Sequence, residues 1–320
     1  MKLATLPDGT IDGRLHVVSR DLTRSSPAHG ARTMQALIDD WDGFSPVLET
    51  QYADLNVGGG DPFDATDALA PLPRAWQWLD GSVYDSHGDL MQTVFNLDPN
   101  PKGRPLMYQG MSHQFLPATA DVPFPSEKDG IDFEGEFGLI CDTVPMGTDA
   151  ATARGHIRLL VQINDWSLRT LAPIEMKTGF GWIHAKPACS VAPIAVTPDE
   201  LGDAWRDARI DLPLTVDLNG ERFGNAEGYH MTYGFDELIA HAAYSRSLAA
   251  GTVIGSGTVS NENFREVGSS CLAERRGIEL LDHGKPETPY MSFGDHIRME
   301  CKTRDGQSVF GEINQTVISA

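Results

Sequence analysis

Between residues 132 and 137 the chain alternates between acidic and apolar or small residues, in the order Asp-Phe-Glu-Gly-Glu-Phe. This alternation is the pattern of a half-buried β-strand, in which side chains two residues apart point to the same side. Asp132, Glu134 and Glu136 would then share one face, with the Cα atoms of successive acids roughly 6.5 to 7 Å apart. Like charges on one face destabilise a strand, and a divalent cation such as magnesium or calcium relieves the repulsion. The run therefore predicts either a solvated strand face or a metal site.

The composition is that of a globular chain with an acidic surface. Of its 320 residues, 41% are hydrophobic, which is enough for a large core and for two domains. The formal net charge of −20 repels phosphate backbones, so nucleic acid is not expected as a partner. No stretch approaches the ~18 to 20 apolar residues of a membrane helix, and residues 1–9 contain no apolar signal segment. We therefore expect a cytoplasmic protein without a membrane partner.

The cysteines argue against a disulfide scaffold and against a zinc or iron–sulfur centre. There are four, they are widely separated, and no two form a C-x-x-C pair. Buried free thiols are the expected state in a chain of this length. These residues are Cys141, Cys189, Cys271 and Cys301.

Two domains are predicted, a small N-terminal domain over residues 1–72 and a larger domain over residues 73–320. Residues 3–19 read as a hairpin that turns through Asp8-Gly9, and residues 34–41 as a short helix. A turn-rich stretch follows, and the prolines Pro71 and Pro73 mark the boundary.

The larger domain is predicted to be β-rich, of the α+β class. Short strand patterns are more frequent than helical ones, which favours this class over a doubly wound parallel sheet. Asn219-Gly220 between apolar runs is the sequence of a type I′ hairpin turn. The other expected elements are helices over 151–157 and 235–248 and strands over 159–163, 297–300 and 309–313.

Three further places carry chemistry, and each also has an ordinary interpretation. Asp80 precedes His87 by seven residues in a loop-like stretch, although a lone histidine is usually a surface or structural residue. Asp165 follows an apolar strand, where an acid can serve a site or simply end a turn. The segment 255–261 contains glycines that could cradle an anion, but it lacks P-loop spacing and is better explained as a tight turn.

Taken together and in this order, these residues resemble the fumarylacetoacetate hydrolase family over roughly residues 70–315. The resemblance implies a catalytic domain with a mixed β-sandwich roll. The N-terminal part is similar to the small extra domain of a bacterial branch of the family. The motifs are Asp80…His87, Asp132-x-Glu134-x-Glu136, Asn164-Asp165-Trp166-Ser167-x-Arg169, Lys186, Gly257-Thr258-Val259-Ser260 and Gly294-Asp295-x-Ile297.

The resemblance implies a divalent metal held by Asp80, Glu134, Glu136 and Asp165. Four carboxylates without a cysteine form a hard oxygen site, which suits magnesium or calcium and disfavours zinc. In this arrangement Asp80 comes from a loop, the two glutamates from one strand and Asp165 from the end of another. Asp132 lies outside the matched ligand positions, and we interpret it as a second-layer or surface residue.

The resemblance also implies the catalytic residues. His87 matches the family's catalytic histidine, and its carboxylate partner should lie after the Gly-Thr turn, where Glu274 is the best candidate and Glu279 is nearby. A carboxylate on one imidazole nitrogen fixes the tautomer, so that the other nitrogen can take a proton from water. Lys186 matches a lysine that stabilises developing negative charge. Arg169, Thr258 and Tyr108 match positions that bind substrate.

The reaction implied is hydrolysis of a carbon–carbon bond in a β-diketo acid, such as fumarylacetoacetate to fumarate and acetoacetate, as in tyrosine degradation. The alternatives on the same scaffold are acylpyruvate hydrolysis, oxaloacetate decarboxylation, and hydration or isomerisation of an unsaturated keto acid. A metal-binding protein without turnover is a rival of another class. Ala172 and Asn96 stand where the animal enzyme has a glutamine and an arginine, so the substrate pocket should differ. The family is usually dimeric, and we expect a homodimer.

Overall fold

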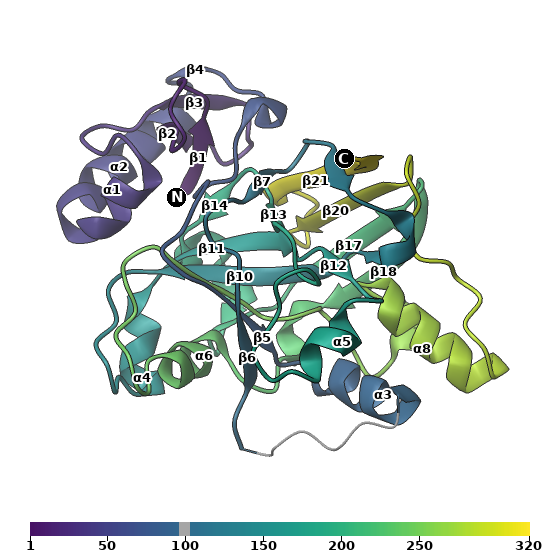
Figure 1. Cartoon of the computed structure of the whole chain (residues 1–320). Coiled ribbons are helices and arrows are strands. Elements are labelled where there is room, and N and C mark those ends of the chain that lie inside the picture. Colours follow the sequence, from purple (N-terminus) through teal and green to yellow (C-terminus); the bar gives the residue numbers. More distant parts are fainter. Residues whose placement is uncertain (96–102) are drawn as a thin grey trace.

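The structure is a computed structural model that describes residues 1–95 and 103–320. Asn96, one of the two expected departures in the substrate pocket, lies outside the described residues. Strands form the centre of the molecule, and helices surround them on the outside (Figure 1). The expected β-rich α+β class is confirmed.

The larger sheet passes through both expected domains. Its strand order is β4-β3-β2-β1-β14-β11-β10-β19-β5-β6, with β13 and β7 attached beside β11. Most neighbouring strands are antiparallel, but β19 and β5 run parallel. The bounds are β1 Lys2–Leu6, β2 Arg14–Val18, β3 Arg24–Pro27, β4 Asp61–Pro62, β5 Trp78–Ser82, β6 Leu106–Gly110, β7 Leu116–Pro117, β10 Gly135–Cys141, β11 Ile157–Asn164, β13 Ser190–Val191, β14 Ala195–Val196 and β19 Thr252–Gly255.

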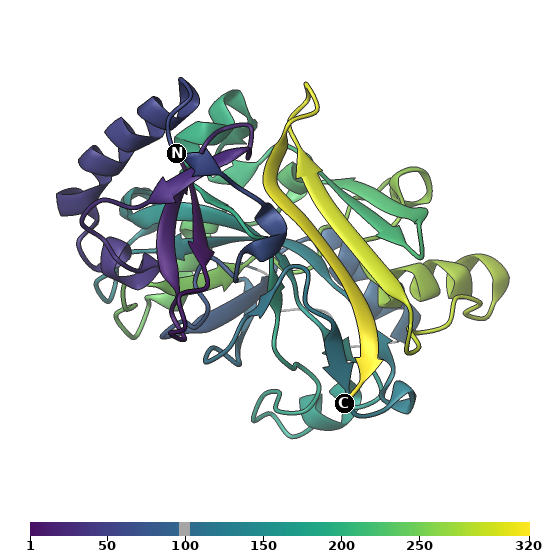
Figure 2. The same ribbon diagram turned by 90° about the horizontal axis from the view of Figure 1, so that it is seen from above.

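A second sheet of five strands packs against the first, and the main core lies between them. Its order is β18-β17-β20-β21-β8, and β20 and β21 form the long pair at the C-terminal end of the chain (Figure 2). Phe137 of β10 and Phe310 of β21 meet across the core, with ring centroids 6.1 Å apart. The bounds are β8 Val122–Phe124, β17 Pro213–Leu218, β18 Glu221–Glu227, β20 His296–Lys302 and β21 Ser308–Ser319; shorter pairs are β9 Ile131–Asp132 with β12 Ser167–Leu168, and β15 Trp205–Arg206 with β16 Arg209–Ile210.

The N-terminal strands extend the sheet of the larger domain. Strand β1 pairs with β2 on one side and with β14 on the other, where Lys2 is opposite Val196. Leu3 and Leu15 are fully buried under helix α1, Met34–Asp39, and helix α2, Trp41–Asn56, which cover these strands from outside (Figure 1).

The remaining helices lie mostly in the larger domain. Helix α3 contacts α8, and α4 contacts α6. Among the described residues, every helix is too short or too polar to cross a bilayer. The four cysteines are buried and unpaired, as expected. The bounds are α3 Asp85–Phe95, α4 Ala150–Ala153, α5 Ala172–Met176, α6 Phe235–Ala242, α7 Phe264–Val267 and α8 Leu272–His283; the short 3-10 segments span residues 65–67, 127–129, 154–156, 198–204 and 228–230.

Several local expectations were wrong. Asp80 is in the buried strand β5 rather than in a loop, and His87 is in the first turn of α3. The run 132–137 is not one strand, because β9 ends at Asp132 and β10 begins at Gly135. Glu134, between them, pairs with Cys271 in a single bridge. Helix α2 occupies part of the stretch expected to be turns, and the helix expected over 235–248 ends at Ala242.

Candidate active site

Strand β5 places Asp80 beside a glycine turn and beside Tyr108. Asp80 is opposite Gly255 of the parallel strand β19 and opposite Tyr108 of β6. The backbone N–H of Gly257 donates to Asp80 Oδ1 at 3.1 Å. The segment expected to be a tight turn thus also supplies a backbone donor to the carboxyl group of Asp80.

The close approach of this turn to β5 explains why residues 255 and 257 are glycines. Gly257 has a φ of +77°, where L side chains are strained, and a Cβ there would lie 2.5 Å from the carbonyl oxygen of Gly81. At Gly255 a Cβ would lie 2.4 Å from Asp80 Oδ1 and 3.0 Å from Glu136 Oε2. Both positions need the absence of a side chain.

We predict that Gly255→Ala displaces Asp80 and Glu136 and weakens divalent-metal binding by at least about 10-fold, the low end of the cost of disturbing groups that orient a ligand. Calorimetric titration with Mn²⁺ measures the change. Gly284→Ala is the matched control, because a Cβ at Gly284 meets nothing within 4 Å, although its φ of +76° will lower the melting temperature. Equal Mn²⁺ affinity in Gly255→Ala and wild type would contradict this prediction.

Three buried carboxylates converge next to this turn. Oxygen atoms of Asp80, Glu136 and Asp165 all lie within 4.8 Å of one another. Their exposed fractions are 4%, 0% and 0%. Neither carboxylate oxygen of Glu136 has a hydrogen-bond partner in the described part of the chain. Burial and the nearby carboxylates raise the pKa values of Asp80 and Glu136 well above their usual range.

Two cations lie beside the carboxylates, both bound to Glu134. Lys186 Nζ donates to Glu134 Oε2 and, at 2.7 Å, to Asp165 Oδ2. Arg169 Nη2 donates to Glu134 Oε1 at 2.6 Å. Burial would raise the pKa of Glu134, but Lys186 and Arg169 outweigh it and lower that pKa. Burial would likewise lower the pKa of Lys186, but Asp165 and Glu134 raise it. Glu134 and Lys186 are therefore charged.

The charges fit a divalent cation. Lys186 and Arg169 carry two positive charges, fewer than the five carboxyl groups around them (Asp80, Asp132, Glu134, Glu136 and Asp165), and the pKa values of Asp80 and Glu136 are raised accordingly. Buried charge without a partner is costly, and Glu136 has none among the described residues. A cluster of three carboxylates, without nitrogen or sulfur ligands, suits a hard cation such as magnesium, calcium or manganese. The donor set therefore fits a divalent metal.

A histidine–carboxylate pair lies next to this cluster. His87 Nδ1 lies 3.1 Å from Glu274 Oε2, and the His87 side chain is 15% exposed. The hydroxyl of Ser260 donates to Glu274 Oε1 at 2.8 Å, and Ser86 donates to Ser260 at 2.9 Å. Both oxygens of Glu274 are thus occupied, and one of them is directed at the imidazole.

Two family models match the chain. One, described as fumarylacetoacetate (FAA) hydrolase C-terminal, matches residues 77–318. The other, described as fumarylacetoacetase N-terminal domain 2, matches residues 1–74.

The chain belongs to the fumarylacetoacetate hydrolase family.

Individual relatives agree with this assignment. Fumarylacetoacetase of Caenorhabditis elegans is 23% identical over 336 residues, covering 95% of this chain and 75% of the worm protein. A Burkholderia ambifaria protein described as a hydrolase is 29% identical over 141 residues, 43% of this chain and 46% of its own length. The match thus spans less than half of that Burkholderia relative.

Solved structures share the fold. Maleylpyruvate hydrolase from Sphingobium sp. SYK-6, in complex with manganese(II) and pyruvate, superposes with a TM-score of 0.67 at 19% identity and full coverage of both chains. A 5-carboxymethyl-2-hydroxymuconate delta-isomerase from Mycobacterium smegmatis gives 0.63 at 15% identity, covering 100% of this chain and 99% of its own. Enzymes of this family are hydrolases or isomerases of related substrates, and they bind a divalent metal.

Two residues that the family resemblance placed in the site, Glu134 and Glu279, have other contacts than expected. Glu134 is held by Lys186 and Arg169 and is not one of the three converging acids. Glu279 accepts bonds from the backbone of Glu287 and Thr288 at 2.6 and 2.8 Å and has no contact with His87, whose partner is Glu274.

The expected substrate-binding residues also lie near the cluster. The hydroxyl of Tyr108 donates to Asp165 Oδ2 at 2.6 Å, and its ring contacts Trp182. Thr258 is buried directly after Gly257. Two donor nitrogens of Arg169 are already bound, to Asp132 and Glu134. Arg169 therefore connects Asp132 to Glu134 within the site.

Sequence reasoning missed several members of this family site. Ser86 lies next to His87 and Ser260 ends the quoted Gly-Thr-Val-Ser motif, but the sequence did not predict that Ser260 bonds to Glu274 or Ser86 to Ser260. Cys189 donates through Sγ to Asp165 Oδ1 at 2.9 Å. The carboxylate of Glu175 accepts three backbone N–H bonds from residues 183–185 and fixes the segment just before Lys186.

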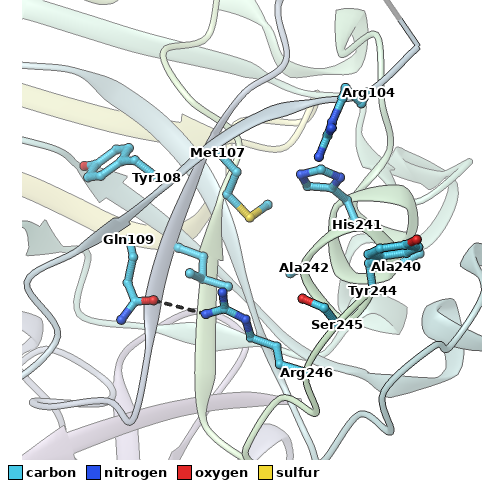
Figure 3. A pocket seen from close by; sticks show the side chains of 11 residues that line it. Arg104, Met107, Tyr108, Gln109, Ala240, His241, Ala242, Tyr244, Ser245 and Arg246 are labelled. Carbon is cyan, nitrogen blue, oxygen red and sulfur yellow. Dashed lines mark hydrogen bonds between the residues drawn. The ribbon is translucent and has the colours of Figure 1, made fainter. Parts of the chain in front are cut away.

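A cavity of about 570 Å³ lies between β6 and the end of α6 (Figure 3). Its lining includes Met107 and Gln109 of β6 and the basic side chains Arg104, His241 and Arg246. Side chains alternate along a strand, so these β6 residues face away from the side of Tyr108 that reaches Asp165. Apart from Tyr108, no residue of the site described above lines this cavity.

Proposed function

We propose that the protein hydrolyses a carbon–carbon bond in a β-diketo acid, with fumarylacetoacetate and related acylpyruvates as the substrate class. The observation that carries this proposal is the pair His87–Glu274 at 3.1 Å beside the carboxylate cluster. Hydrolysis needs a base that activates water, and this pair supplies one next to a site that fits a metal. A divalent cation held by Asp80, Glu136 and Asp165, with the predicted ligand Glu134, would polarise the 1,3-dicarbonyl as a Lewis acid.

The protein's own groups perform the proton transfers. Glu274 holds the Nδ1–H of His87, which leaves Nε2 to take a proton from water as the hydroxide adds to the carbonyl carbon. Lys186 is a charged donor that stabilises the oxyanion formed by this addition. The bond to the neighbouring carbon then breaks, and the imidazolium returns its proton to the leaving enolate. The products are a carboxylic acid and a ketone.

Isomerisation or decarboxylation is the rival proposal, and a solved relative of similar fold is an isomerase. Decarboxylation needs no activated water, so it gives no purpose to a histidine whose partner carboxylate is itself fixed by Ser260. The dyad therefore favours hydrolysis over decarboxylation, and the substrate screen separates hydrolysis from isomerisation, which also uses a base.

The experiment is a substrate screen with Mg²⁺, Ca²⁺ or Mn²⁺, followed by loss of ultraviolet absorbance. We expect turnover of more than one β-diketo acid among fumarylacetoacetate, fumarylpyruvate and acetylpyruvate, because Ala172 provides no side-chain donor where the animal enzyme has a glutamine. Oxaloacetate and an unsaturated keto acid serve as comparison substrates. Turnover of these two without any hydrolysis of the diketo acids would overturn the proposal. A strong preference for fumarylacetoacetate alone would contradict the expected turnover of several β-diketo acids.

A further inference from the structure

Asp132 is a buried carboxylate that accepts three hydrogen bonds from two different segments of the chain. Its Oδ1 accepts the backbone N–H of Leu272 at 2.7 Å, and its Oδ2 accepts that of Ala273 at 3.0 Å. Arg169 Nε donates to Oδ2 at 2.7 Å. The side chain is 0% exposed, so of the two positions expected for Asp132 the surface one was wrong and the second-layer one remains.

These contacts join the two halves of the site. Leu272 and Ala273 begin helix α8, and the next residue is Glu274, the partner of His87. Arg169 uses its other nitrogen to bind Glu134, which Lys186 connects to Asp165. Asp132 is thus bonded both to the backbone that carries the base's partner and to the cation that holds the carboxylate cluster.

An ordinary helix cap does not account for this arrangement. The N-cap position of α8 is filled by Cys271, whose Sγ accepts the N–H of Glu274 at 3.3 Å. A cap carboxylate is also usually exposed to water, as at Asp149, the N-cap of α4, which accepts the N–H of Thr152 at 2.8 Å. Asp132 instead has the partly buried guanidinium of Arg169 on the same oxygen that accepts the N–H of Ala273.

We propose that Asp132 is a positioning residue, which fixes the first turn of α8 against Arg169 so that Glu274 meets the imidazole of His87. This inference rests on the proposed function only in naming His87 as the base. The geometry of the His87–Glu274 bond can be measured without turnover.

The test is Asp132→Asn, with Asp149→Asn as the matched control. An amide presents one acceptor where Asp132 presents two, so in either orientation its NH₂ faces a buried N–H donor. The first turn of α8 must then shift. The readout is the downfield proton resonance of the His87 Nδ1–H in the metal-free protein, assigned by its loss in His87→Gln. His156, whose Nδ1 lies 2.6 Å from Asp142 Oδ1, gives an internal reference signal.

In Asp132→Asn we expect the His87 signal to disappear or broaden while the His156 signal stays. Turnover of the best substrate should fall by roughly 10²-fold in kcat with little change in KM, since a displacement of about 1 Å in a catalytic group costs about that factor. On a Glu274→Gln background the same substitution should cost little more, because both changes act through one bond. Asp149→Asn should match wild type in both signals and in kcat.

An unchanged His87 signal in folded Asp132→Asn would overturn the proposal, whatever the substrate proves to be. If Asp132→Asn does not fold, Arg169→Gln removes the other end of the same contact and is read in the same way. Loss of the His87 signal there supports the proposal, and its retention overturns it. Failure of the proposed function would give a different result. The substrate screen would then show no hydrolysis, while the wild-type protein would still show the His87 signal.

Discussion

Glu136→Gln should abolish divalent-metal binding and reduce turnover to the metal-free background. Glu136 is fully buried, its oxygens have no partner in the described residues, and they lie next to Asp80 and Asp165. Loss of a group that only orients a metal ligand costs 10- to 100-fold in affinity, and loss of a ligand should exceed that range. Titration with Mn²⁺ and turnover before and after EDTA measure both effects.

The same substitution should have opposite effects on stability with and without metal. Without metal, Glu136 is a buried acid surrounded by other carboxylates, so a neutral amide should leave the melting temperature equal or higher. With metal at about 100 times its Kd, wild type gains about 2.7 kcal/mol, and the variant gains nothing. Glu312→Gln, at a half-exposed position within β21 and outside the carboxylate cluster, is a control that keeps the site. Turnover by wild type that survives EDTA would contradict the metal assignment.

The raised pKa values of Asp80 and Glu136 give a dependence on pH. Acids with a raised folded-state pKa stabilise the metal-free protein at low pH, and this contribution is lost as pH rises through their folded pKa values. Metal must displace these protons, so its affinity should rise with pH. Calorimetry in two buffers of different ionisation heat should therefore detect proton release on binding.

His87→Gln should lower kcat by about 10²- to 10⁴-fold, the usual value of general-base catalysis, while metal binding survives. Glu274→Gln should also lower kcat, because it removes the acceptor of the Nδ1–H. The double variant should lose far less than the product of the two single losses, since both residues act in one step. A cycle of kcat values for the four proteins, with Mn²⁺ affinity measured for each, tests this coupling.

The control for this cycle is Glu279→Gln, which removes a carboxylate from the same helix α8 without a contact to His87. It should leave kcat close to that of wild type. Multiplicative losses for His87 and Glu274 would separate Glu274 from the dyad, and full activity of His87→Gln would favour a decarboxylase.

Features that depend on neighbouring residues in the chain could be predicted from the sequence. The Asn219-Gly220 turn, with both residues at positive φ, joins β17 to β18 as the hairpin pattern predicts. The helix over 151–157 and the strand after it appear as α4, the short 3-10 turn and β11. The order and spacing of the acidic residues and His87 were enough to reveal the resemblance to the fumarylacetoacetate hydrolase family, and this family assignment is confirmed.

Features that depend on packing could not be predicted in this way. Helix α2 contains Gly43 and Pro46, which are poor helix formers, and its buried residues, such as Leu48, are stabilised by the N-terminal strands. Asp80 was expected in a loop, whereas its strand is fixed by β19, far away in the sequence. The bond between Asp132 and α8 joins residues 140 positions apart, and no local pattern records such a contact.

The parallel pairing of β5 with β19 has a consequence for how the chain folds. Asp80 meets Gly255 and the N–H of Gly257 only after a loop of 177 residues has closed, and closing long loops delays folding. The carboxylates that we propose bind the metal thus come together late, so a cation has no assembled site on the unfolded chain and should not nucleate folding. We expect refolding at the same slow rate with or without Mn²⁺, and metal to act by slowing unfolding.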